Sequence, residues 1–141
     1  MQKWIKIVLI VSGIFLIAGS VVVNIIYNKP HRDVMKEQSV QLSAQKLYEA
    51  FRTNEAEANK LYLDKAIEMT GEVSEIIINQ DGKVVINFKT NDPLFVINCT
   101  FKTNPGELKS GQTITFKGIC TGYIPDANVV INEGVLVSKI K

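Results

Sequence analysis

The chain of 141 residues is long enough for one domain of ordinary size and leaves little room for a second. Two of its 16 basic residues, Lys3 and Lys6, precede a long apolar run, so the rest of the chain carries 14 basic and 14 acidic residues and is neutral. Domains that bind nucleic acid normally carry a basic surplus, and two cysteines are too few for a disulfide-rich scaffold. Composition therefore argues against both classes.

An apolar run near the N-terminus is long enough to span a membrane. Residues 7–28 contain no charged side chain, and as a helix these 22 positions reach roughly 33 Å at about 1.5 Å per residue. The hydrocarbon core of a bilayer is roughly 30 Å thick. Trp4 and Tyr27 flank the run, where aromatic rings favour the membrane interface. We predict that residues 1–28 form a transmembrane anchor that contacts the membrane through residues 7–28.

A cleaved signal peptide is the alternative for this segment, because a basic start is followed by the small residues Ala18-Gly19-Ser20. Cleavage there would leave an apolar new N-terminus at Val21, which favours the uncleaved anchor. Basic residues lie on both sides of the run, so the positive-inside rule is nearly balanced. An N-terminal apolar helix usually acts as an export signal. We therefore expect a single-pass protein of the cytoplasmic (inner) membrane whose C-terminal domain is periplasmic or otherwise extracytoplasmic.

A polar segment with Pro30 comes next, and we predict a linker over residues 29–41 and a domain over residues 42–141. The domain opens with helical signals. Ser43 is a suitable N-cap for an apolar stripe at helical spacing, and Asn54 followed three residues later by a glutamate indicates a second helix start. A pair of short helices, or one kinked helix, is expected to pack its stripe on the domain.

From Lys65 onward the pattern changes to short strands separated by turn signals. Gly71 indicates a bulge within the first strand, and Asp81-Gly82 indicates a two-residue hairpin turn after it. Five strands at short intervals after a helical lead-in favour a small barrel over a sandwich, so the fold class is mainly β. The strands are predicted at residues 66–79, 83–89, 95–102, 113–120 and 128–139.

Three segments carry a family resemblance, residues 47–73, 96–101 (VINCTF) and 108–123. The first contains the motifs YLDK (62–65) and TG (70–71), and the third contains KGICTG (117–122). In these segments the sequence resembles the bacterial tRNA_anti-like family of small OB-fold proteins, which are often membrane-anchored or exported. The resemblance implies a five-stranded OB-fold barrel with no catalytic residues to carry over, and it names no ligand. Where relatives carry a further cysteine in the last strand, this chain has Asn132-Glu133-Gly134, so a disulfide pattern is not carried over.

No catalytic set is visible in the predicted domain. The single histidine, His31, lies in the linker, so Ser-His and Cys-His chemistry is not available. Glu68, Glu72 and Glu75 lie near the first strand and could pair as acid and base, but carboxylates on the outer face of a strand are usually only solvated. No P-loop, GxGxxG or metal-ligand spacing is present. We expect no enzyme activity, no cofactor and no metal.

The aromatic residues of the strands, Phe88, Phe95, Phe101 and Phe116, fall on the inward-facing phase. Single-strand binders of the OB class use aromatic platforms on the outer face of the second and third strands, so this surface would stack bases poorly. It is nevertheless the candidate binding surface. Its residues are Lys83, Asn87, Lys89, Asn98, Thr100 and Lys102.

Cys99 and Cys120 both fall on the inward phase of their strands. Two buried thiols and a disulfide are the alternatives. Free cysteine packs well as a small apolar residue. The third and fourth strands of an OB barrel are not neighbours, and a Cα separation above about 7 Å forbids the bond. We favour the two thiols.

Together these features predict a membrane-anchored OB-fold binding or interaction module of the bacterial envelope, with a protein, peptide or glycan as its partner near the membrane. The alternative is a nucleic-acid-binding OB domain, similar to an anticodon-binding domain, that faces the cytoplasm. Neutral charge and inward aromatic rings favour the first.

Overall fold

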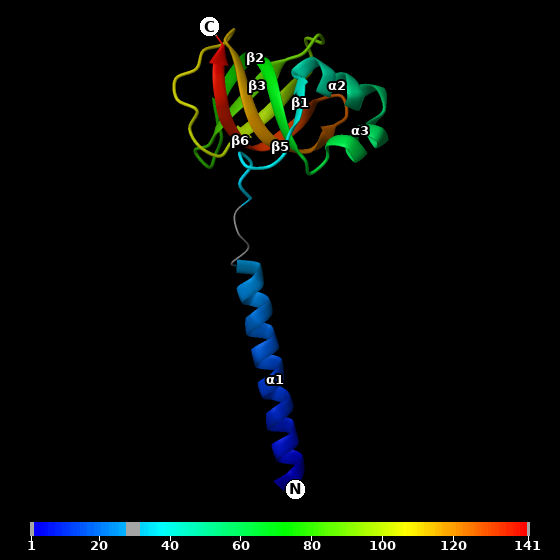
Figure 1. The fold of residues 1–141 in the computed structure, drawn as a ribbon, viewed down its shortest axis with the longest axis vertical. Helices are drawn as coiled ribbons and strands as arrows, with labels where there is room; N and C mark the ends of the chain where they lie inside the picture. The colour runs from blue at the N-terminus through cyan, green and yellow to red at the C-terminus, as the bar shows by residue number, and fades with distance from the viewer. Residues whose placement is uncertain (1, 28–31, 141) are drawn as a thin grey trace. The chain divides into compact units, whose positions relative to one another are not determined.

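The computed structural model describes residues 2–27 and 32–140. It divides into an N-terminal unit, residues 1–32, and a domain, residues 33–141. The described part of the first unit is essentially one helix, α1 (Gln2–Tyr27), seen in blue in Figure 1. Its segment Lys3–Tyr27 is long and apolar enough to cross a membrane, a property that signal sequences share. Asn28, the end of the predicted span, and His31 lie outside the described residues.

The domain begins earlier than the sequence predicted. A short strand, β1 (Val40–Ser43), pairs in parallel with the first half of β2 (Ala66–Ile78). Upstream of it Val34 is 2% exposed, because its side chain packs against Ala66 and Ile119 of the barrel. The linker predicted over residues 29–41 therefore ends before Val34, and the strand was missed because four residues give too short a pattern to detect.

Lys117 holds the same segment against the barrel. This side chain is only 9% exposed. Its Nζ donates hydrogen bonds to the backbone carbonyls of Met35, at 3.2 Å, and Glu37, at 3.0 Å. A buried ammonium needs such acceptors, so Lys117 adds to the packing of Val34 in holding the segment before β1 against the barrel.

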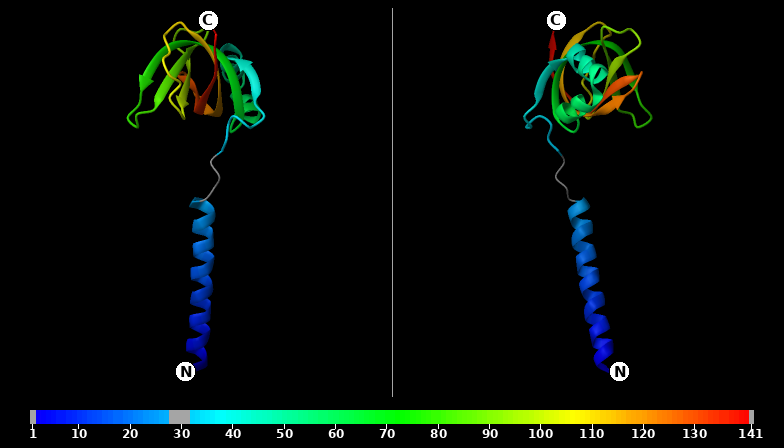
Figure 2. Two further views of the ribbon diagram at one scale, coloured as in Figure 1. Left: turned by 60° about the vertical axis from the view of Figure 1, so that its left-hand side comes forward. Right: turned by 90° about the vertical axis from the view of Figure 1, so that its right-hand side faces the viewer.

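The predicted helix pair is present, with the break where it was expected. Helices α2 (Ala44–Thr53) and α3 (Glu55–Tyr62) are separated by Asn54. The side chain of Ser43 caps the first and that of Asn54 caps the second, each accepting a backbone N–H three residues on. The right-hand view of Figure 2 looks onto these helices, with the barrel behind them.

The remaining strands complete a barrel with β2. Their order around the sheet is β2-β3-β4-β6-β5, and β5 returns to pair with β2, while β1 adds to the side of β2. All neighbours within the barrel are antiparallel except β4 and β6, which are parallel. This five-stranded closed order with one parallel pair is the topology of an OB fold. The strands are β3 (Val84–Lys89), β4 (Val96–Phe101), β5 (Thr113–Ile124) and β6 (Asn128–Ile140).

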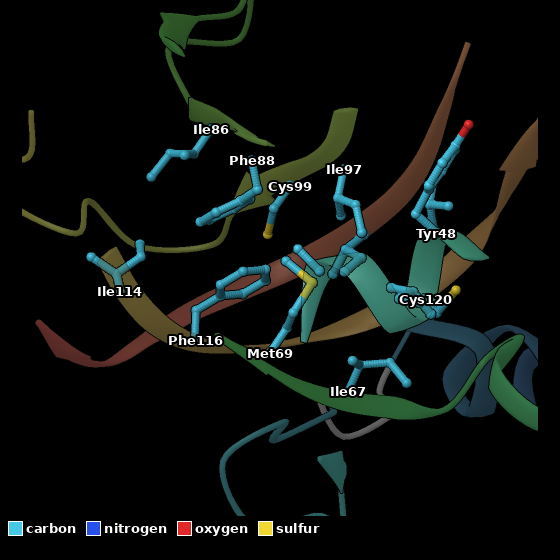
Figure 3. Packing of buried hydrophobic residues seen from close by; sticks show 14 of the residues in the cluster. Tyr48, Ile67, Met69, Ile86, Phe88, Ile97, Cys99, Ile114, Phe116 and Cys120 are labelled. Carbon is cyan, nitrogen blue, oxygen red and sulfur yellow. The ribbon is translucent and has the colours of Figure 1, made fainter. Parts of the chain in front are cut away.

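The barrel interior is filled by aromatic and branched side chains (Figure 3). The ring of Phe116 stacks on Phe88, with centroids 4.7 Å apart, and contacts Phe101 at 5.6 Å. All three are at most 1% exposed, as the inward phase of their strands predicted. One end of the interior is closed by α2, whose Leu47 and Phe51 are also buried there.

The bulge in β2 is not at Gly71, where it was predicted. Gly71 pairs regularly with Ile114, and the pairing with β3 shifts between Val73 and Glu75 instead. Gly71 has a packing role, because a Cβ atom there would lie 3.0 Å from the ring of Phe88. A glycine in a strand marks either a bulge or a close approach, and the sequence alone does not separate the two.

The β2–β3 turn is at the predicted place but is one residue longer than expected. The N–H of Asn79 donates to the carbonyl of Lys83 at 3.0 Å, which leaves three residues in the loop. Gly82 adopts a positive φ of 73° at the last of them, the position where three-residue hairpins favour glycine.

Cys99 and Cys120 are buried free thiols. In the sheet register both pair with Ile131 of β6, one from each side. Two such steps of about 4.5–5.5 Å separate their Cα atoms by roughly 10 Å, beyond the roughly 7 Å that a disulfide allows. Burial raises the pKa of the Cys120 thiol to about 11, and that of Cys99 well above its usual range, so both are poor nucleophiles.

Candidate binding surface

The candidate surface is the outer side of β2, β3, β4 and the middle of β6, which we call the polar face. The structure brings together the side chains that were predicted to form it, in two adjoining groups. Asn87 and Lys89 contact carboxylates of β2, and Asn98 bonds to Asn87. The other three predicted residues line a depression next to them. The polar face comprises Glu72, Ser74, Glu75, Asn79, Asp81, Lys83, Asn87, Lys89, Asn98, Thr100, Lys102, Asn132 and Glu133.

Two asparagines form a hydrogen-bonded ladder across three strands. Asn87 and Asn98 are register partners on β3 and β4. Nδ2 of Asn98 donates to Oδ1 of Asn87 at 2.7 Å, and Nδ2 of Asn87 donates to Oε2 of Glu75 at 3.1 Å. The bulge after Val73 places Glu75 opposite Asn87. Each amide orients the next, so the ladder presents donors and acceptors in a fixed pattern.

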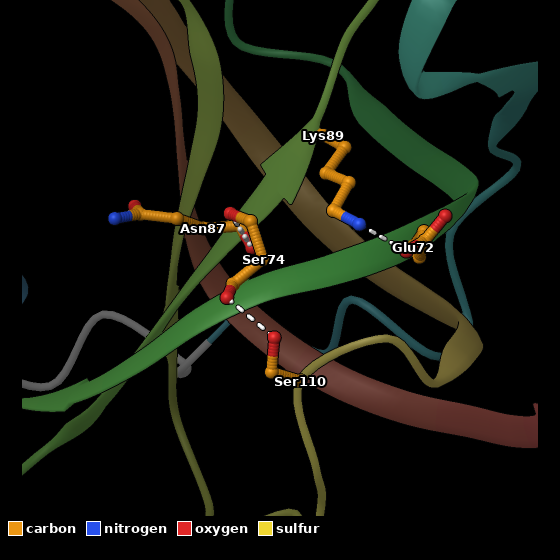
Figure 4. A network of polar contacts seen from close by, with 5 residues as sticks. All are labelled: Glu72, Ser74, Asn87, Lys89 and Ser110. Atoms are coloured by element: carbon orange, nitrogen blue, oxygen red, sulfur yellow. Dashed lines mark hydrogen bonds and ion pairs between the residues drawn. The ribbon is translucent and has the colours of Figure 1, made fainter. Parts of the chain in front are cut away.

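The lysines at the two ends of the polar face are paired with carboxylates. Lys89 forms an ion pair with Glu72, shown in Figure 4 beside the hydrogen bonds of Ser74. Lys102 pairs with Glu133 at 2.8 Å. Exposed pairs of this kind add little stability, but they cancel the positive potential that would attract phosphates.

A polar depression of about 320 Å³ lies beside the ladder. Its lining includes Lys83, which directly precedes β3, and Thr100 of β4. Lys102, which directly follows β4, and Glu133 of β6 complete the charged part of the lining. Glu133 has a φ of 57°, a left-handed conformation that is uncommon for a residue other than glycine. This conformation falls at a register shift between β4 and β6. The lining carries both charges and several neutral polar groups.

Sequence reasoning missed the acidic half of this surface. Glu72 and Glu75 were interpreted as merely solvated, whereas each contacts one of the predicted residues. The signal that could have found Glu72 is its place on the same outward phase as Lys89 in the neighbouring strand. Glu133 carried no signal, because its position depends on a register shift that the sequence pattern does not reveal.

The polar face lacks the features of a base-stacking surface. Across the described residues 33–140, none of the exposed large apolar side chains is aromatic. No group of three or more potential metal ligands is found among the described residues either. What the surface offers is an array of hydrogen-bond donors and acceptors with compensated charge, which suits a polar partner of low net charge.

These features define an OB-fold domain that lies after an N-terminal apolar helix in the chain. More specifically, the chain belongs to the tRNA_anti-like family, whose model matches residues 1–135. The resemblance stated from the sequence is thereby confirmed. No curated protein matches the sequence.

Among solved structures, the chain is similar to one described as a putative aspartyl-tRNA synthetase from Leishmania major Friedlin. The two are 8% identical, with a TM-score of 0.43 over 81% of this chain. The match covers 23% of that protein's length. The assignment of the OB fold therefore rests on the strand order and pairing described above.

Proposed function

We propose that this chain is a non-enzymatic binding module of the bacterial envelope. Helix α1 holds it in the cytoplasmic membrane. Its OB-fold domain binds a protein, peptide or glycan outside the cytoplasm through the polar face. The observation that carries the proposal is the charge-compensated ladder of Glu75, Asn87 and Asn98 between the Lys89–Glu72 and Lys102–Glu133 pairs. Such a surface recognises neutral polar groups by directed hydrogen bonds. It neither concentrates positive charge nor offers rings.

The same observation makes nucleic acid a poor partner. Fluorescence polarisation with mixed-sequence single-stranded DNA and RNA, using the full chain in detergent at physiological salt, should give dissociation constants weaker than about 10 μM. The matched control is Glu72→Lys with Glu75→Lys, which reverses two charges on the polar face. This variant should bind measurably tighter and with a stronger salt dependence, because it recreates a basic surface.

Sub-micromolar affinity of the unchanged chain that falls steeply with added salt would contradict the proposal. It would favour instead a nucleic-acid-binding domain facing the cytoplasm, because the compensating carboxylates would then have failed to suppress phosphate binding.

The membrane orientation gives a separate prediction. Alkaline phosphatase fused after Lys141 should be active in a bacterial host, because the apolar helix near the N-terminus is expected to direct export of the domain behind it. A green fluorescent protein fused at the same place is the matched control and should stay dark. An inactive phosphatase fusion with a bright fluorescent one would place the domain in the cytoplasm.

A further inference from the structure

One strand edge of the barrel is open. The last four residues of β2, 75–78, pair with β3 on one side only. On the other side, β5 stops pairing with β2 at Glu72. The loop before β5 continues to Ser74, where Ser110 donates to its backbone carbonyl. Beyond Ser74, no strand in the described part of the domain pairs with this second side of β2. The β2–β3 hairpin projects from the barrel in the left-hand view of Figure 2.

This edge is apolar and carries three exposed isoleucines in a row. Ile76, Ile77 and Ile78 are 37%, 42% and 71% exposed. An exposed apolar edge is a template for pairing with another strand, and proteins normally protect such edges with charged residues. The free end of β6 carries Lys139 in this role, and β1 is only four residues long. Residues 76–78 of β2 contain no charged residue, so this edge is not protected against pairing with another strand.

The direction of the free backbone groups is set by the turn. The N–H of Asn79 bonds to Lys83 across the hairpin. Hydrogen-bonded and non-hydrogen-bonded pairs alternate along antiparallel strands. Ile78 is therefore in a non-bonded pair with β3, as is Ile76, and Ile77 is in a bonded pair. The backbone N–H and C=O groups of Ile76 and Ile78 consequently point out of the open edge.

These groups match a second copy of the same edge. In an antiparallel ladder with two-fold symmetry about Ile77, Ile76 of each copy faces Ile78 of the other, and both carry outward-pointing groups, so four hydrogen bonds can form. Ile77 then faces its own counterpart in a non-bonded pair. Glu75 faces Asn79, so no like charges are opposed. An isologous contact requires this self-complementarity.

We propose that two copies of this chain pair through the edges of β2, in an antiparallel ladder centred on Ile77. Five residues from each copy, 75–79, are far fewer than the roughly 20–30 a side of a standard interface, so the contact is weak between freely diffusing domains. The proposal rests on the membrane anchor proposed above, because confinement to one membrane raises the effective concentration of the copies.

Cysteine cross-linking in membranes tests the pairing. Full-length Ile77→Cys is treated with copper phenanthroline in isolated membranes and quenched with N-ethylmaleimide. The control is Leu94→Cys, because Leu94 is 83% exposed and lies in the loop before β4. If collisions were random, the control would cross-link more. We expect about tenfold more dimer from Ile77→Cys, since paired copies hold the two thiols together. Cys99 and Cys120 are buried and should not contribute.

A second cross-linking experiment tests the register, in which Ile76 of one copy faces Ile78 of the other. When Ile76→Cys and Ile78→Cys chains with tags of different size are expressed together, the mixed dimer should exceed either homodimer. This arm also serves if Ile77→Cys does not fold. Carbonate extraction of the same samples reports on the anchor.

Dimer from Ile77→Cys no greater than from Leu94→Cys, with the chain in the membrane fraction, would overturn the pairing and leave the anchor intact. Cross-links from Ile77→Cys to a different protein alone would also overturn it and make the edge a site for a peptide strand. Absence of the chain from the membrane fraction would contradict the anchor itself, and with it the confinement on which the pairing depends.

Discussion

Replacing Phe116 with alanine should lower the free energy of unfolding of the domain, residues 33–141, by about 3–5 kcal/mol. The residue is fully buried and joins two other rings, stacking on Phe88 and contacting Phe101. Truncation removes this contact from the middle of the barrel, where neighbours on closed strands cannot move in to fill the space. Urea denaturation followed by circular dichroism measures the change, provided that the m-value is unaltered.

Leu94→Ala is the matched control for this prediction. Leu94 is 83% exposed, so its truncation should change stability by less than about 0.5 kcal/mol. A loss of about 1 kcal/mol or less for Phe116→Ala would mean that the three rings are not packed as described, and that α2 rather than the barrel interior supplies most of the core.

The second large effect is expected at Gly134. A Cβ atom added there would lie 2.6 Å from Sγ of Cys99, which is closer than non-bonded atoms approach. Gly134→Ala should therefore cost about 1–3 kcal/mol through overpacking. Removing the sulfur relieves the clash, so Gly134→Ala combined with Cys99→Ala should cost at least about 0.5 kcal/mol less than the two single changes added together.

Cys120→Ala supplies the control for this cycle. Cys120 is equally buried in the core, but the atoms nearest to an added Cβ at Gly134 belong to Cys99 and Phe101. Its combination with Gly134→Ala should be additive within about 0.5 kcal/mol. Equal coupling of Gly134 to both cysteines would show that the effect is a general loosening of the core.

Most of the fold could be predicted because its signals are local. Alternating apolar residues identified the five barrel strands, and Ser43 and Asn54 marked both helix starts. What failed depended on contacts between distant residues. The strand β1 exists because it pairs with β2, the bulge falls after Val73 rather than at Gly71, and Lys117 is covered by a segment some 80 positions away.

The sequence predicted the basic and amide side chains of the candidate surface but not their acidic partners. Lysines and asparagines on one strand phase are visible in a sequence, so Lys89 and Asn98 were named. Their acidic partners were not, because which carboxylate meets which lysine depends on register. Glu133 reaches Lys102 because Glu133 itself has a left-handed backbone conformation at a register shift between β4 and β6. No sequence pattern specifies that combination.

The place of β6 in the barrel bears on when this domain can fold. Within the barrel, β6 is the strand that lies between β4 and β5, and it is the last to be synthesised. A nascent chain that ends before Asn128 lacks the strand that closes the cylinder. The other closing contact, between β2 and β5, joins residues far apart in sequence, and such non-local pairing slows folding. The barrel therefore cannot close until β6 has been synthesised.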